Sequence, residues 1–185
     1  MKYSKEEVID IVKAWLAISI AFAILLRGLT DSIFTTFILS IFTVGIGFLL
    51  HELGHKYLAQ KYGCFAEFRS FDFMLILAIA LSFLGFIFAA PGAVFIHGNI
   101  NKEKNGKISA IGPLINIILA LLFLPLSFYS SGFLALIGSY GLQINAWLAV
   151  FNMIPILNLD GSKVFAWSKI AWVLILIPAI VLLFV

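Results

Sequence analysis

The chain has 185 residues, of which 63% are hydrophobic and 11% are charged, and its formal net charge is +3. Soluble domains carry about 25% charged residues because water must wet their surface, so this composition excludes a soluble globular protein, and it is too hydrophobic for a disordered one. The chain is therefore expected to be a polytopic membrane protein, without the long block of positive charge that would predict nucleic-acid binding.

The N-terminal third predicts two long helices. Ser4 followed by Glu7 three residues later is the pattern of a capping box, which begins a helix that continues into a first apolar segment, Ile11 to Leu26. After a short polar turn, a second apolar segment begins at Ile33 and continues to a stop at Gly63. The polar side chains of this second segment gather near its C-terminal end, so any chemistry that it carries lies there.

The middle of the chain predicts two short strands around a third hydrophobic segment. Residues 64–72 alternate aromatic or small residues with charged ones, which is typical of a short strand or an interfacial stretch. Phe73 to Ala90 is apolar and contains Gly85. Residues 93–99 are a second candidate strand, whose edge is expected to pair with the extended backbone of an unwound substrate.

Three more apolar segments complete the chain. The fourth covers about Ile108 to Phe128, the fifth about Phe133 to Phe151, and the sixth ends at Val185 after beginning at Val164 or Ile170. The predicted fold class is an all-α polytopic membrane protein with about five spanning helices, one embedded or re-entrant segment and short β-strands near the site.

His51, Glu52 and His55 form the pattern H-E-x-x-H near the end of the second segment. On a helix, two histidines four residues apart lie on one face and can bind one metal ion, and zinc suits neutral imidazoles. Glu52 lies beside that face, where it can act as a general base toward a zinc-bound water and then pass the proton to a leaving amine. The simpler interpretation is that these side chains snorkel at a helix end. We favour the metal site because ionisable groups within a membrane are costly and usually functional.

A catalytic zinc site needs a third protein ligand and one open position. Asp160 stands out because it ends the interruption N-M-I-P-I-L-N-L-D, in which Pro155 breaks the helix, and because Gly161 then lets the chain turn. An ordinary polar loop between two spans explains these residues about equally well when they are taken alone. The other candidates by residue type are Asp10, Asp31, Glu67, Asp72, His97 and Glu103.

Together, these motifs resemble those of the site-2 proteases, which are intramembrane zinc metalloproteases that cleave membrane-embedded substrates. The resemblance rests on H-E-L-G-H in the second segment and N-x-x-P-x-x-x-L-D-G after a later one. A third motif, G-P-L-I-N from Gly112 to Asn116, is similar to the G-P-x-x-N of that family at the start of a core helix. The resemblance covers about Gly45 to Gly161.

The resemblance implies one Zn²⁺ per chain with His51, His55 and Asp160 as its ligands. It implies that Glu52 is the general base and that Asn152 assists at the substrate carbonyl or at the oxyanion. The implied function is an intramembrane zinc endopeptidase that hydrolyses peptide bonds in or near transmembrane segments of substrate proteins. The expected partners are such a membrane-protein substrate and the lipid bilayer.

The resemblance also bears on domain organisation. Many relatives carry a PDZ or CBS module, and we expect neither in a chain of this length. The prediction is a single membrane-embedded domain over residues 1–185, with a core at about 33–162.

Charge placement predicts how the chain crosses the membrane. The positive-inside rule favours a cytoplasmic N-terminus, since that end carries Lys2, Lys5 and Lys13. The second segment then returns H-E-L-G-H to the cytoplasmic side of the cell membrane. If Phe73–Ala90 crossed fully, Asp160 would lie on the opposite face from the two histidines. We therefore predict that Phe73–Ala90 is embedded without spanning and folds back near Gly85.

Two other functions stay open at this point. A different H-E-x-x-H metalloprotease would take its third ligand from a glutamate on a downstream helix, but Glu67 and Glu103 lie in short polar connections. A small transporter or metal-binding membrane protein without hydrolytic activity would keep its function in a Glu52→Gln variant, whereas a protease would lose cleavage and still bind zinc.

Overall fold

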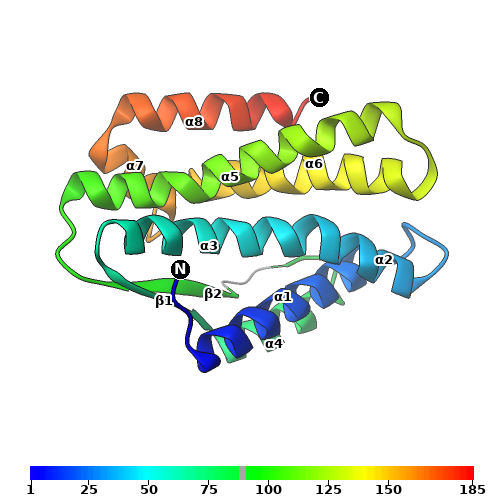
Figure 1. Ribbon diagram of the computed structural model, residues 1–185. Coiled ribbons are helices and arrows are strands. Elements are labelled where there is room, and N and C mark those ends of the chain that lie inside the picture. Colours follow the sequence, from blue (N-terminus) through cyan, green and yellow to red (C-terminus); the bar gives the residue numbers. More distant parts are fainter. Residues whose placement is uncertain (88–90) are drawn as a thin grey trace.

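The computed structural model describes residues 1–87 and 91–185 as a mostly helical protein with one two-stranded sheet (Figure 1). The elements in chain order are α1 (Lys5–Leu25), α2 (Ile33–Ser40), the π-helical turn η1 (Ile41–Gly45), α3 (Ile46–Lys61), β1 (Phe65–Ser70), α4 (Asp72–Ser82), β2 (Gly92–His97), α5 (Lys102–Tyr129), α6 (Gly132–Asn152), α7 (Asp160–Trp167) and α8 (Lys169–Leu182).

Four helices in the described part of the chain are long and apolar enough to cross a membrane. They are Lys5–Leu25, Ile33–Lys61, Lys102–Tyr129 and Gly132–Asn152. This finding fits a membrane protein, but it does not confirm the prediction of about five spans. The difference lies in the sixth segment, where Ser168 separates α7 from the 14-residue α8. At 1.5 Å per residue, α8 is about 21 Å long, which is shorter than the hydrocarbon core of about 30 Å.

The second predicted segment is one helical body that extends over 29 residues, Ile33–Lys61. It ends where predicted, because Gly63 adopts φ +79°, a left-handed conformation that terminates helices. The sequence does not reveal the π-helical turn Ile41–Gly45 within it. Such a turn inserts one extra residue and so changes the direction in which the following side chains point.

The predicted capping box is half present at the start of α1. The backbone N–H of Glu7 donates to Ser4 Oγ over 3.0 Å, as the pattern predicts. The Glu7 carboxylate, however, does not return to the backbone of Ser4. It is buried against Lys56 of α3 and the backbone N–H of Phe68 in β1. A residue that resembles a local cap therefore makes tertiary contacts.

The two predicted strands are present and pair in antiparallel fashion. Phe65 lies opposite His97 at one end of the ribbon, and Ser70 lies opposite Gly92 at the other. The hydrophobic segment between Ser70 and Gly92 therefore begins and ends at the same place. Its helix α4 has 11 residues, or about 16 Å, and the chain turns at Gly85, whose φ is +89°. The last three residues of the predicted segment, 88–90, lie outside the described residues.

Helix α3 lies between two groups of elements (Figure 1). On one side α5 packs against α3, α6 and α7, and α8 covers α6. On the other side lie α1, which packs against α4, and the β-ribbon, which packs against α3. The C-terminal half of α3, the first turns of α5 and the start of α7 meet at one end of the molecule, and this arrangement builds the site.

Candidate metal centre

His51 and His55 of α3 meet Asp160, the first residue of α7. The Nε2 atoms of His51 and His55 lie 3.2 and 3.0 Å from Asp160 Oδ2. One ligand atom from each residue lies within 4.8 Å of the others, and all three residues are buried. Within the described residues, this is the one such group of three His, Cys, Asp or Glu side chains. Two motifs that are 109 residues apart therefore converge on one point.

Hydrogen bonds to the other ring nitrogens orient both imidazoles. His55 Nδ1 donates to the backbone carbonyl of Ile108 over 2.7 Å, since a carbonyl can only accept. His51 Nδ1 lies 2.6 Å from Asn116 Oδ1 and donates to it, because the amide nitrogen of Asn116 donates elsewhere. With Nδ1 protonated on each ring, the Nε2 lone pairs are left free to bind a metal.

Asn116 is held by contacts with two other elements. Its Nδ2 donates to the carbonyl of Gly47 over 3.1 Å and to Asn145 Oδ1 over 2.9 Å. Asn145 of α6 in turn donates to the carbonyl of Gly141. The motif resemblance singles out Asn116 without a role for it, and no motif marks Asn145. The signal for Asn145 is an amide within an apolar span, which needs a partner at membrane depth.

Gly112 allows α5 to lie directly against the two imidazoles. A Cβ atom at this position would lie 2.5 Å from His51 Nε2 and 2.6 Å from His55 Cε1. Any side chain there would occupy the space beside the metal-binding nitrogens. The glycine of the G-P-x-x-N motif is therefore required for room at the site.

The loop before Asp160 is fixed by α7 and α8. Trp172 Nε1 of α8 donates to the carbonyl of Met153 over 2.7 Å. Gly161 packs on the same peptide, where a Cβ would lie 2.2 Å from Met153 O. Asp160 Oδ2 is held within 3.2 Å of both ring Nε2 atoms, where it can serve as the third ligand of the same metal ion.

Glu52 and Asn152 are placed differently from the three metal-binding candidates. Glu52 is on α3 next to His51, and its carboxylate lies close to the backbone N–H of Val94 in β2. Asn152 is the last residue of α6, and its amide nitrogen donates to the carbonyl of Leu148 in its own helix over 2.9 Å. The catalytic roles predicted for both residues stay predictions.

The other candidate ligands do not join this cluster. Asp10 and Asp72 both pair with Lys13, and Glu103 pairs with Lys107. A pocket of about 630 Å³ lies between the N-terminal residues and the end of α3, and none of the three clustered residues lines it. His51, His55 and Asp160 therefore form the candidate metal site within the described residues.

This donor set fits zinc. Two neutral imidazole nitrogens and one carboxylate oxygen are typical of catalytic zinc sites, which keep one further position open. Both Nδ1 atoms donate to fixed acceptors, Asp160 supplies a carboxylate oxygen, and Gly112 leaves space beside the rings. Zinc is the cofactor that the site and the related proteins below imply.

Comparison with known proteins identified two relatives. The chain is 40% identical over 183 residues to the "Putative zinc metalloprotease MJ0611" of Methanocaldococcus jannaschii, covering 97% of this chain and 93% of that protein. It is 30% identical over 150 residues to the "Zinc metalloprotease MJ0392" of the same organism, covering 78% of this chain but 39% of that protein. No family model and no solved structure matches the chain.

Proposed function

The chain belongs to a family of zinc metalloproteases, and we propose that it acts within the membrane as an endopeptidase of the site-2 protease type. The single observation that carries the proposal is the meeting of two imidazole Nε2 atoms with one carboxylate oxygen at 3.0 and 3.2 Å. Two of these ligands come from the helix Ile33–Lys61, which is long enough to span a membrane, and the third is the first residue of α7, which follows another such helix, Gly132–Asn152. This placement supports a site in the membrane-embedded part of the chain.

The residues around the metal take distinct roles in this proposal. Bound zinc supplies Lewis-acid activation of the attacking water. Glu52 takes the proton of that water as general base and delivers it to the leaving amine. Asn152 assists at the substrate carbonyl, for which its side chain must leave the carbonyl of Leu148. His51, His55 and Asp160 hold the metal.

The proposed substrate is a transmembrane segment that is locally unwound. A helical peptide hides its carbonyl groups in its own hydrogen bonds, so cleavage needs an extended stretch. β2 lies beside α3, and Val94 brings its backbone N–H close to Glu52. A substrate strand that pairs with β2 would place its own backbone next to the general base.

The proposed topology puts the N-terminus and the site toward the cytoplasmic side of the cell membrane. The lysines near the N-terminus favour this orientation. In this topology the hydrophobic segment after β1 is embedded without spanning, and the pairing of Ser70 with Gly92 supports this part of the proposal. The helices α5 and α6 then cross the membrane outward and back, so Asp160 stays on the same side as His51 and His55.

The test compares zinc content and cleavage of a model transmembrane substrate in the purified wild type and in two variants. Glu52→Gln is expected to bind one zinc ion and to cleave no substrate, since it lacks the general base. Asp160→Ala is expected to lose both zinc and cleavage. The controls are Glu103→Gln and Asp31→Ala, which make the same changes at exposed positions.

Each result separates the proposal from its alternatives. A Glu52→Gln variant that keeps its function supports a metal-binding protein or transporter without hydrolytic activity. An Asp160→Ala variant that retains zinc and activity contradicts the assignment of the third ligand.

A further inference from the structure

Glu7 and Lys56 form a buried ion pair that the proposed chemistry does not use. Their side chains are 1% and 0% exposed. Lys56 follows the metal-binding candidate His55 on α3, and the ring of Tyr3 covers its ammonium group at 3.9 Å. Because taking two charges out of water is costly, we expect the second oxygen of the buried Glu7 carboxylate to have a hydrogen-bond partner too.

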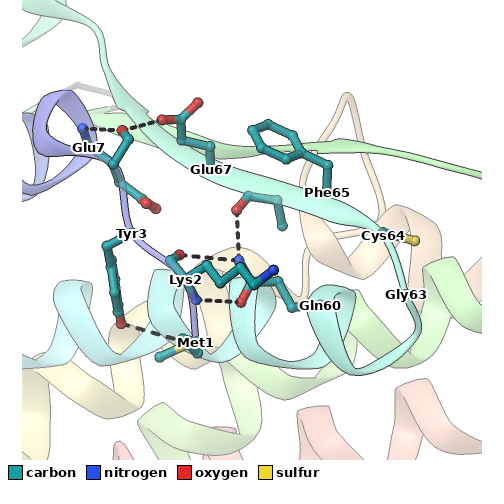
Figure 2. A pocket seen from close by; sticks show the side chains of 11 residues that line it. Met1, Lys2, Tyr3, Glu7, Gln60, Gly63, Cys64, Phe65 and Glu67 are labelled. Atoms are coloured by element: carbon teal, nitrogen blue, oxygen red, sulfur yellow. Dashed lines mark hydrogen bonds between the residues drawn. The ribbon is translucent and has the colours of Figure 1, made fainter.

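The second oxygen of Glu7 anchors the β-ribbon. Glu7 Oε1 accepts a hydrogen bond from the backbone N–H of Phe68 over 2.9 Å. Two residues along β1, the carbonyl of Ala66 accepts from Gln60 Nε2 of α3 over 3.2 Å. Gln60 also exchanges hydrogen bonds with the backbone of Lys2, so the N-terminal residues lie against the same edge (Figure 2). Side chains of α1 and α3 thus close the outer edge of β1.

This anchoring determines which way β2 faces. The N–H and C=O of one strand residue point to the same side, so Ala66 and Phe68 direct theirs away from β2. Their partners in the register are Ile96 and Val94, which therefore direct their own backbone groups away from β1. The Val94 N–H that lies close to the Glu52 carboxylate is on this free edge. One edge of the ribbon is closed, and the other lies at the site.

We infer that Glu7 is a positioning residue, whose carboxylate, held by Lys56, locks the ribbon so that the free edge of β2 faces Glu52. Lys56 and Glu52 are one helical turn apart on α3, so the lock and the general base share one rigid element. An extended substrate can then join the ribbon at β2 and not at β1. The consequence for substrate rests on the proposed function, whereas the anchoring itself does not.

The experiment uses two double variants that differ in one side chain. Glu7→Gln/Lys56→Met removes both charges but keeps an oxygen that can accept from Phe68. Glu7→Met/Lys56→Met has the same charge and nearly the same volume but lacks that oxygen. Gln60→Met, which removes the contact with Ala66 alone, is a milder third variant. The measurements on the full chain are zinc content, hydrogen exchange of residues 65–70 and 92–97, and KM and kcat for a transmembrane peptide.

We expect Glu7→Met/Lys56→Met to exchange these amides about tenfold faster than Glu7→Gln/Lys56→Met, with zinc retained at one ion per chain. KM should rise by a similar factor while kcat changes little, and Gln60→Met should show a smaller effect in the same strands. If only the Met/Met variant fails to fold, the carboxyl oxygen is needed and the inference is supported.

The inference is overturned if the two double variants exchange alike, if both unfold alike, or if zinc is lost together with the faster exchange. A general loss of stability without a change in KM would mean that the pair has only a structural role. If the wild type cleaves no peptide, the proposed function fails, and the exchange data still decide whether Glu7 locks the ribbon.

Discussion

His51 and Asn116 are joined by a hydrogen bond of 2.6 Å between Nδ1 and Oδ1, although 65 residues separate them in the chain. The bond links α3 to α5 and selects the tautomer of His51 that exposes Nε2 to the metal. Loss of a partner that orients a ligating histidine typically lowers metal affinity about 10- to 100-fold. We therefore expect Asn116 to support the metal site without touching the metal.

Asn116→Ala should weaken zinc binding about 10- to 100-fold, because His51 loses the acceptor that fixes its ring. Competition with a chelator of known affinity measures this change. Asn105→Ala, which makes the same change near the start of the same helix, is the control and should bind zinc like the wild type. Equal affinities in the two variants would show that Asn116 does not orient the ligand.

Gly112→Ala should abolish zinc binding, because the new methyl group would lie 2.5 Å from His51 Nε2. Gly138→Ala is the control for a steric clash that lies away from the metal site. Its methyl group would lie 2.3 Å from the backbone of Ser127, far along α5 from the site. It should lower the thermal midpoint and leave the zinc content at one ion per chain. Zinc retention by the Gly112→Ala variant would contradict the close packing of α5 on the rings.

How far the sequence predicts this site depends on how local each signal is. His51 and His55 are four residues apart, so helical geometry alone places them on one face. Asp160 is marked by Pro155 and Gly161, but its meeting with the histidines depends on how three helices pack. The motif resemblance predicts that Asp160 meets the two histidines, and the structure brings the three side chains together.

Other features have a weak or misleading local signal. Glu7 has the spacing of a capping residue, and only tertiary structure shows that it pairs with Lys56, because a buried charge needs a partner from another element. Ser168 caps α8 by accepting from the backbone N–H of Ala171, so of the two predicted starts of the sixth segment, Val164 and Ile170, the later one matches this helix. Asn145 lies in a span whose average hydropathy hides a single amide.

Trp172→Phe should weaken zinc binding about two- to tenfold, since the loop before Asp160 loses the hydrogen bond from Nε1 to the carbonyl of Met153. The phenyl ring can still pack against Phe165, whose ring centroid lies 5.4 Å from that of Trp172. Trp147→Phe makes the same chemical change at a side chain that is 60% exposed, and it should have no effect on zinc. An unchanged affinity in the Trp172→Phe variant would mean that α8 does not support the third ligand.

The strand pairing leads to a prediction about topology. Ser70 and Gly92 are partners, so the residues before β1 and after β2 must lie on the same side of the membrane. In a Cys64→Ser background, the variants Lys61→Cys and Lys102→Cys should react with an impermeant thiol reagent added from one side. The variant Ser131→Cys should react only from the other side, since the 28-residue α5 lies between it and Lys102. Labelling of Lys102→Cys from the side opposite to Lys61→Cys would mean that the segment between the strands crosses the membrane, and such a crossing cannot coexist with the pairing of Ser70 and Gly92.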